Sequence, residues 1–370
     1  MTGDSAGGRP WLSPGHRRPC KVSLTMIVRD EESSLPGCLE SARGLFDEAI
    51  VVDTGSTDRT AEIARSFGAR VFDFVWIDDF AAARNAALGL ATGDYVFWLD
   101  ADETIDPSGR EALRLLLDAV EPDGGRAYTM RFDGPGVPEP GIYQDRLFPC
   151  RPGIRWTCRI HEVIWPSIRR AGVSPYPSGA AVRHSGYADP ADHARKRGRN
   201  ERILRAWLAE RPDDPFALWH AGRLAAAPCH FAEALALYRR SLRGWPTDLM
   251  AEAPRAYIAQ AEWEMGHHRA ALRTCADALA LALHHAPAWF ARGRMHRGLG
   301  EADEAERCWR RVLALAEGPP EPMAYFDPHF EACRARRELA SLAIRRGDTE
   351  TAARLHREVL AKDPDDQETS

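Results

Sequence analysis

Short apolar runs alternate with helical spacing through the first half of the chain. Runs rich in branched and aromatic residues predict buried strands over residues 22–28, 48–53, 70–74 and 95–99. Between them, apolar positions follow helical spacing, as at Leu35, Leu39 and Ala42. Ser56 or Thr57 is expected to cap the second of these helices. Continuous apolar strands separated by helices of about ten residues predict a Rossmann-like α/β domain with a mostly parallel sheet.

The second half of the chain repeats itself. Small residues recur at Ala234, Ala271, Ala305 and Ala352, with spacings of 37, 34 and 47 residues. Another small residue precedes each of them by one helix length, and glycines mark most of the turns between. Small residues where helices cross, with a turn between the helices, give hairpins that resemble tetratricopeptide repeats. We expect four such hairpins in an all-α solenoid, with residues 318–322 looped out.

Length and composition favour a two-domain protein of the cytoplasm. The 370 residues divide into an expected disordered tail (1–20), the α/β domain (21–190), a linker helix (191–212) and the repeats (213–370). A net charge of −5 does not favour a nucleic-acid partner. No apolar run approaches the roughly 20 residues that span a membrane. Eight scattered cysteines without a Cys-x-x-Cys pair indicate reduced thiols and no zinc site.

Acidic residues follow two of the predicted strands. Asp53 ends the second strand, and Asp100 and Asp102 follow the fourth. The carboxyl ends of parallel strands meet at one edge of a sheet, where open α/β sheets bind ligands. Carboxylates there suit Mg²⁺ or Mn²⁺, which also bind phosphate oxygens. An Asp-x-Asp pair alone is more often a cap or a solvated loop, and Asp53 alone is more often a turn former. The three together favour nucleotide binding.

Four segments carry a family resemblance. They are residues 23–32, 51–58, 80–85 and 98–103. Their order and spacing resemble family 2 glycosyltransferases, which have the GT-A fold. The sequence departs from that family at Arg29-Asp30, where a polar residue and Asn are more usual, and this difference affects contacts to the nucleobase.

The resemblance implies roles in binding a nucleotide sugar and a metal ion. Contacts to the nucleobase and ribose are implied for Val28, Asp30 and Asp53, contacts to the diphosphate or ribose for Arg84 and Asn85, and contacts to the ribose and to Mn²⁺ or Mg²⁺ for Asp100 and Asp102. The alternative for Arg84 is a surface arginine on an alanine-rich helix.

Beyond the aspartates, the pattern predicts a helix over 108–120 and a hairpin of 126–132 with 142–148. The segment that follows resembles the acceptor side of the family, and its Glu162 is the candidate general base, with Asp102 or Glu103 as alternatives. An inverting sugar transfer needs such a group to take the acceptor proton. His161 binds the donor phosphates, orients Glu162 or does neither.

Further basic residues complete the candidate site. His184 matches a histidine that many GT-A enzymes place against the metal or diphosphate; the alternative is a strand-end histidine packed on Tyr187. Lys196 and Arg199 lie in a basic run that is usually a solvated helix face, and they are the candidates for closing the diphosphate pocket.

Together these features predict a metal-dependent, inverting glycosyltransferase with a UDP-linked donor. The layout is similar to bacterial peptide glycosyltransferases, including the sublancin-type enzymes that modify cysteine, which implies a peptide or protein acceptor. A lipid-linked or cell-envelope glycan is the rival acceptor, and the repeats suit a protein partner or self-association. Two other functional classes are alternatives. One is a non-catalytic repeat scaffold; the other is a nucleotidyl transferase, which would normally carry a Gly-rich loop after the first strand.

Overall fold

The computed structural model describes residues 11, 18–122, 125–134, 142–184, 190–245, 252–317 and 328–361. The chain forms two compact units, residues 1–203 and 204–370. Most of the expected tail and the insertion 318–322 lie outside the described residues. The end of that tail is packed, contrary to our expectation. Cys20 is buried in the core of the first unit, and Arg18 Nε donates to Asp118 Oδ1 at 3.1 Å.

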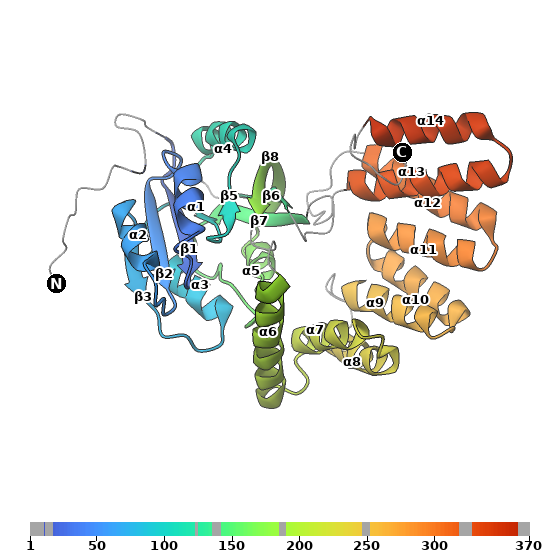
Figure 1. Cartoon of the computed structure of the whole chain (residues 1–370), viewed down its shortest axis with the longest axis horizontal. Coiled ribbons are helices and arrows are strands. Elements are labelled where there is room, and N and C mark those ends of the chain that lie inside the picture. Colours follow the sequence, from blue (N-terminus) through green and yellow to red (C-terminus); the bar gives the residue numbers. More distant parts are fainter. Residues whose placement is uncertain are drawn as a thin grey trace. The chain divides into compact units, whose positions relative to one another are not determined.

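The first unit is built on one mixed sheet in the order β3-β2-β1-β4-β7-β6-β8-β5 (Figure 1). The strands are β1 (Val22–Val28), β2 (Glu48–Asp53), β3 (Arg70–Asp73), β4 (Tyr95–Trp98), β5 (Glu103–Thr104), β6 (Arg126–Asp133), β7 (Ile142–Pro149) and β8 (Ser174–His184). Strands β3, β2, β1 and β4 pair in parallel, which confirms the predicted first half. β7 pairs antiparallel with both β4 and β6, and β5 pairs antiparallel with β8. β5 and most of β8 were not predicted.

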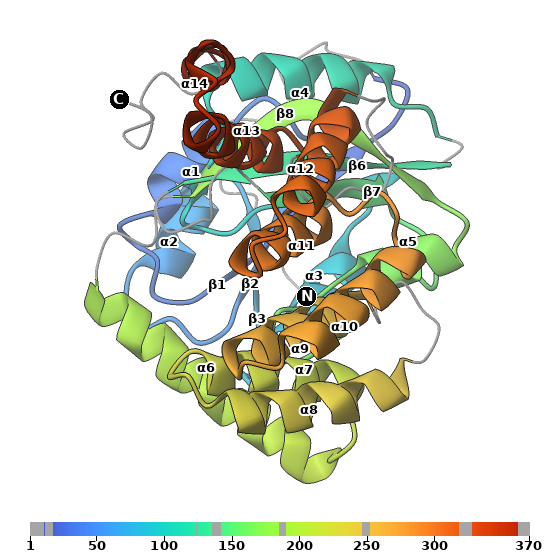
Figure 2. The same ribbon diagram turned by 90° about the vertical axis from the view of Figure 1, so that its right-hand side faces the viewer.

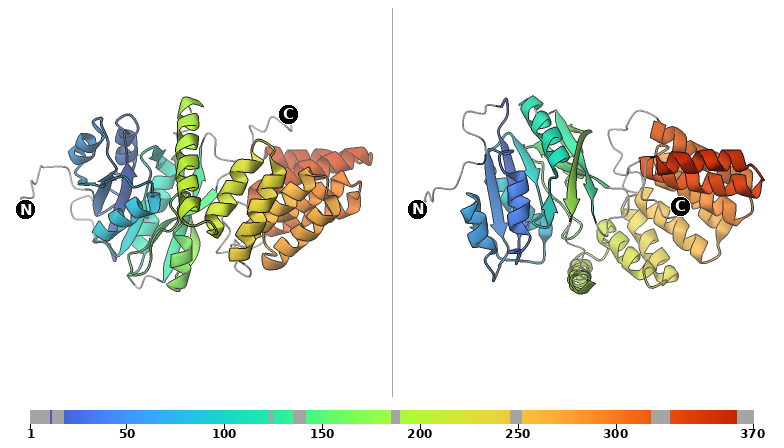
Figure 3. Two further views of the ribbon diagram at one scale, coloured as in Figure 1. Left: turned by 90° about the horizontal axis from the view of Figure 1, so that it is seen from below. Right: turned by 45° about the horizontal axis from the view of Figure 1, so that its top comes forward.

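Helices cover both faces of this sheet (Figure 3). One face packs on α1 (Leu35–Ala42), α2 (Thr60–Ser66) and α4 (Pro107–Ala119), and the other packs on α3 (Phe80–Leu90) and α5 (Trp165–Arg170). Side chains of β1, among them Leu24 and Met26, fill the first core, while Val96 and Trp98 of β4 fill the second. The alternation of strand side chains thus builds a three-layer α/β/α unit.

The cap of α2 differs from our prediction. The helix begins at Thr60, and the Asp58 carboxylate accepts from the Thr60 backbone N–H at 2.9 Å. Ser56 and Thr57 instead bond to Asp30: the Asp30 N–H donates to Ser56 Oγ at 3.0 Å, and the Thr57 N–H donates to Asp30 Oδ1 at 2.7 Å. The loop after β2 is therefore tied to the loop after β1 rather than to the helix.

The second unit consists of paired helices stacked in chain order (Figures 1 and 2). The long helix α6 (Pro190–Glu210) leads into it, in the place of the expected linker helix. The pairs are α7 (Pro215–Ala226) with α8 (Phe231–Gly244), α9 (Glu252–Glu264) with α10 (His268–Leu281), α11 (Ala286–Gly298) with α12 (Ala302–Glu317) and α13 (Pro328–Arg345) with α14 (Thr349–Leu360). Four hairpins were predicted, and four are found among the described residues. In that same part of the chain, no helix combines the length and the apolar character needed to cross a membrane.

The recurring small residues mark the places where helices of a pair touch. A Cβ on Gly222 would lie 2.4 Å from Tyr238 Cε1, and a Cβ on Gly293 would lie 2.4 Å from Trp309 Nε1. Tyr238 and Trp309 are among the largest fully buried side chains. The glycines therefore admit an aromatic ring from the partner helix.

Replacing Gly293 by alanine is expected to destabilise the second unit. The added methyl group collides with a buried ring, and overpacking of this kind costs about 1–3 kcal/mol. Chemical denaturation measures the change in the free energy of unfolding. Gly89→Ala in α3 is the control, because a Cβ at that position would have no atom within 4 Å. Alanine there also lowers the backbone entropy that is lost on folding, so this substitution should not destabilise the protein. Equal effects of the two substitutions would contradict the packing argument.

Candidate active site

The ends of the parallel strands bring the predicted acidic residues to one edge. In the register of β1 and β2, Val28 lies beside Asp53, and in that of β1 and β4, Thr25 lies beside Trp98. The segments that follow these strands therefore leave the sheet at the same edge. The expectation that Asp53 and the Asp100–Asp102 segment share this edge is confirmed.

At the β1–β2 side, the side chains expected to hold the nucleoside are largely engaged within the protein. Asp53 Oδ1 accepts from the backbone N–H groups of Gly55 (2.9 Å) and Ser56 (2.7 Å), as a turn former does. Val28 is buried in the core, and its carbonyl oxygen accepts from the Thr54 backbone N–H at 2.9 Å. Asp30 is left-handed, with φ 53°. The nucleoside contacts expected of Val28, Asp30 and Asp53 stay predictions.

A buried guanidinium joins two site carboxylates. Arg84 Nη2 lies 2.8 Å from Asp100 Oδ1, and Arg84 Nε lies 2.6 Å from Glu162 Oε1. The Arg84 side chain is 7% exposed, Glu162 is 13% exposed and Asp100 is 37% exposed. Burial alone would lower the pKa of Arg84, but the two carboxylates outweigh burial and raise it above its ordinary value. Arg84 is thus a permanent internal cation, not the surface arginine that we weighed and not an open phosphate contact.

Two tryptophan rings flank this guanidinium. Arg84 Cζ lies 4.4 Å from the ring centroid of Trp98 and 5.0 Å from that of Trp156. Asn85 pairs with the backbone of Trp156 through two hydrogen bonds, one donated by Nδ2 and one accepted by Oδ1, both 2.9 Å long. Asn85 thus holds the Trp156 backbone through its amide oxygen and one amide N–H. Its ribose or diphosphate contact stays a prediction.

A tight loop presents Glu162. Thr157 and Val163 close it with two backbone hydrogen bonds, of 2.9 and 3.0 Å. Within the loop, Cys158 and His161 have φ values of 76° and 52°, in the left-handed region. Such backbone is costly for non-glycine residues and is enriched at functional sites. His161 itself is exposed, and its role stays a prediction.

The other aspartate belongs to a second charged group. Asp102 Oδ2 lies 3.1 Å from His184 Nε2 and 3.4 Å from Lys196 Nζ. Burial by itself would raise the pKa of Asp102, but the hydrogen bond from His184 and the Lys196 charge lower it below the usual value. The sequence placed these three residues in one site, and the structure brings them together. Tyr187, the alternative partner of His184, lies outside the described residues.

Residues of α6 meet this edge along one helix face. Lys196 contacts Asp102, Arg199 Cζ lies 4.8 Å from the Phe80 ring centroid, and Arg202 Nη2 lies 3.1 Å from Asp78 Oδ1. Asp78 is also left-handed, with φ 55°. These contacts show that the basic run is not a wholly solvated face. The diphosphate roles of Lys196 and Arg199 stay predictions.

Sequence reasoning missed two residues beneath and beside these groups. Arg146 lies on β7 and binds Glu103 through two hydrogen bonds, of 2.6 and 2.7 Å, with both side chains at most 2% exposed. Glu103 in turn accepts from the Asp100 backbone N–H at 2.8 Å. This pairing makes Glu103 structural and argues against it as a general base. The available signal was the charged pair Asp145-Arg146 inside a segment predicted to be a strand.

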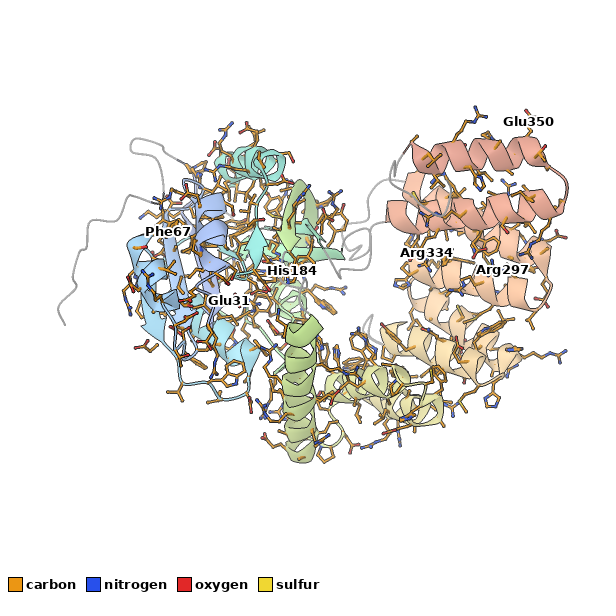
Figure 4. The ribbon with its side chains drawn as sticks, in the orientation of Figure 1. Glu31, Phe67, His184, Arg297, Arg334 and Glu350 are labelled. Carbon is orange, nitrogen blue, oxygen red and sulfur yellow. The ribbon has the colours of Figure 1, made fainter. Side chains whose placement is uncertain are left out.

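Glu31 is the other residue that was missed (Figure 4). Burial raises its pKa, while a hydrogen bond from Ser34 lowers it; Asp102, Lys196 and Asp100 also act on its charge. It adds another carboxyl to the edge that carries the aspartates. Its signal was its place within the first of the four resembling segments.

A divalent cation does not fit the side chains as they are placed. Among the residues that the structure describes, no group of three or more His, Cys, Asp or Glu side chains is arranged to hold a metal ion. Asp100 bonds to Arg84, and the Asp102 oxygen near His184 is shared with Lys196. Asp100, Asp102 and His184 therefore do not converge as the expected metal ligands.

Three parts of the chain match known families. Residues 23–171 match Glycosyl transferase family 2, and residues 286–319 and 335–368 match tetratricopeptide repeat families. The TPR repeat-containing protein Synpcc7942_0270 of Synechococcus elongatus is 33% identical over 314 residues, which cover 80% of this chain and 76% of that protein.

Two further similarities each cover about half of the chain. The SPbeta prophage-derived glycosyltransferase SunS of Bacillus subtilis is 24% identical over 221 residues, covering 55% of this chain and 48% of that protein. The crystal structure of a thermophilic TPR protein of Thermus thermophilus aligns with 48% of this chain and 90% of its own, at 22% identity and a TM-score of 0.36.

Proposed function

Since the chain belongs to the glycosyltransferases that join a glycosyl transferase family 2 domain to tetratricopeptide repeats, we propose that it transfers a sugar from a UDP-linked donor to a peptide or protein. The proposed transfer inverts the configuration at the anomeric carbon of the sugar. The observation that carries the proposal is the pair of carboxylates on Arg84. Asp100 follows the strand that ends at the nucleotide-binding edge, and Glu162 comes from a different, later segment. One group thus joins a donor-side and an acceptor-side carboxylate.

The proposed reaction is a single displacement. An acceptor oxygen, nitrogen or sulfur attacks the anomeric carbon while the bond from that carbon to the diphosphate oxygen breaks. Glu162 takes the acceptor's proton, and the nucleoside diphosphate leaves from the opposite face. Glu162 Oε1 bonds to Arg84, while Oε2 has no hydrogen-bond or ion-pair partner among the described residues, which supports Oε2 as the proton acceptor. Asp102 is the alternative base.

Positive charge near the leaving group comes from the chain itself in this proposal. Lys196 lies beside Asp102, and Arg199 lies on the same helix as Lys196, α6. Cations placed where negative charge develops stabilise the transition state. Because the carboxylates do not fit a divalent cation as they are placed, no step is assigned to a metal.

The repeats support a protein acceptor or partner, because stacked helical hairpins offer an extended binding surface. A cell-envelope or lipid-linked glycan is the rival acceptor, and a non-catalytic scaffold is the alternative of another class. The ordered set of Asp100, Asp102 and Glu162 argues against the scaffold. All eight cysteines are free thiols, which supports the cytoplasm as the place of the reaction.

A thermal-shift panel of UDP-, GDP- and dTDP-sugars tests the donor proposal. A ligand that binds only the folded state stabilises it by linkage and so raises the melting temperature. At a ligand concentration of about a hundred times Kd, the stabilisation is about 2.7 kcal/mol. We expect UDP-sugars to give the largest shift, and slow release of UDP in their presence. A panel without any shift, together with no UDP release, would contradict the proposal. Repeating the turnover assay with EDTA and with Mn²⁺ tests metal dependence separately: a loss of turnover in EDTA that Mn²⁺ restores would support the metal predicted from the sequence.

A further inference from the structure

We propose that Arg84 is a positioning residue that fixes Glu162 and Asp100 relative to each other, so that one side chain holds the general base in register with the donor-side carboxylate. The inference rests on the proposed sugar transfer and adds a role to it. Arg84 acts through the two carboxylates and touches neither substrate.

The hydrogen-bond geometry supports a coupling role. Nε and Nη2 of Arg84 each bond to a different carboxylate, at 2.6 and 2.8 Å. A guanidinium is planar, so the directions of these two N–H groups are fixed relative to each other. The orientation of Glu162 is therefore set by the same rigid group that orients Asp100, although the two residues are 62 positions apart in the chain.

The surroundings hold the guanidinium itself in place. Trp98 and Trp156 flank it, and both residues are anchored: Trp98 Nε1 donates to the Asp145 carbonyl oxygen at 2.6 Å, and Asn85 pairs with the Trp156 backbone. Arg84 lies on α3, whose start is fixed by the Asp79 carboxylate accepting from the Ala82 N–H. A side chain held on every side in this way is pre-organised rather than adaptable.

A second arginine shows what a purely structural pair looks like in the same unit. Arg146 and Glu103 are buried together, with exposed fractions of 0% and 2%, so neither side chain reaches the surface, and Glu103 contacts the site edge only through the Asp100 backbone N–H. By contrast, the partners of Arg84 reach the surface: Asp100 is 37% exposed and Glu162 is 13% exposed. The cation of Arg84 is buried while its carboxylates face outward, which is the arrangement expected of a support for reacting groups.

The first test is Arg84→Lys. An ammonium group keeps the charge but cannot bond to both carboxylates with the same fixed geometry. We expect kcat for UDP-sugar turnover to fall about 100-fold, the size of effect that a 1 Å misplacement produces, while the Kd for UDP changes less than about threefold and the melting curve stays cooperative. Arg70→Lys is the matched control, because Arg70 also pairs with a carboxylate, Glu48 at 2.9 Å, and lies over an aromatic ring, that of Phe72. Arg70 is the first residue of β3, whereas the candidate site lies where the parallel strands end. We expect it to keep wild-type turnover.

A double-mutant cycle separates positioning from general stability. If Arg84 acts through Glu162, then Arg84→Gln should add less than about threefold to the loss already caused by Glu162→Gln, because residues that act as a unit are not additive. Losses that multiply would overturn the inference. Guanidinium ions added to Arg84→Ala are expected to restore part of the turnover, and no rescue of a folded variant would count against the proposal.

The failure of this inference is distinguishable from failure of the proposed function. Wild-type turnover together with an equally active Arg84→Lys would overturn the positioning role and leave sugar transfer intact. A wild-type chain that neither binds UDP nor releases it from any UDP-sugar would overturn both.

Discussion

Glu162→Gln is expected to lower sugar transfer by about 10²- to 10⁴-fold, the range in which general base catalysis contributes, while UDP still binds. Glutamine has nearly the same shape as glutamate, and its side-chain oxygen still accepts from Arg84, so the loop keeps its geometry. What it loses is the ability to take the acceptor's proton. The rate of transfer in a single turnover, measured beside UDP affinity, checks this split.

The control for this substitution is Glu111→Gln. Glu111 also pairs with an arginine, Arg114, at 2.7 Å, but it lies exposed on α4. It should transfer sugar at the wild-type rate. A Glu162→Gln enzyme with near-normal kcat would move the base assignment to Asp102, whose own replacement by asparagine would then be expected to carry the loss.

Arg146→Met is expected to destabilise the first unit by about 3–5 kcal/mol, as removing one partner of a buried ion pair does. The substitution leaves Glu103 inside the protein without its cation, and the Asp100 N–H that bonds to Glu103 shares the disturbance. Urea denaturation followed by tryptophan fluorescence measures the loss, because Arg146 Cζ lies 3.7 Å from the Trp98 ring centroid.

The size of this loss should depend on pH. Burial raises the pKa of Glu103 and Arg146 lowers it, so the pKa rises further once Arg146 is gone. When folding raises the pKa of a carboxyl group, ionising that group destabilises the folded state. This cost grows as the pH rises above the pKa of the group in the unfolded chain, about 4.3. The variant should therefore lose less stability, relative to wild type, at pH 5 than at pH 8.

A double variant provides the control for the buried pair. Arg146→Met combined with Glu103→Gln removes both charges, and we expect it to regain much of the lost stability and to show no such pH dependence. An equal loss for Arg146→Met at both pH values would mean that packing around the methionine, not the unpaired charge, causes the destabilisation.

The parallel half of the sheet could be predicted because its signals are local. Each of these strands contains a short apolar run, β1, β2 and β3 are each followed by a helix, Asp53 ends β2, and Asp100 comes just after β4. The repeats could also be predicted locally, since Gly222 and Gly293 lie where an aromatic ring of the partner helix packs against the backbone. In both cases a short stretch of sequence carries the physical reason for its own structure.

The remainder depended on pairings between distant segments. Arg146 meets Glu103 only because β7 returns antiparallel beside β4, and no local pattern fixes that register. The same holds for Arg84, whose partners come from two other segments. A basic residue at the edge of a site can hold a phosphate or hold the carboxylates, and spacing along the chain does not distinguish the two.

The left-handed residues of the first unit have a consequence for engineering. Among the residues described there, the non-glycine positions with positive φ are Asp30, Asp78, Cys158 and His161, all in loops at or beside the candidate site. Each conformation costs on the order of 1 kcal/mol that a glycine would avoid. Glycine substitutions that would stabilise the enzyme thus fall in loops at or beside the candidate site. A thermostability screen that ignores turnover would therefore be expected to select variants with impaired catalysis.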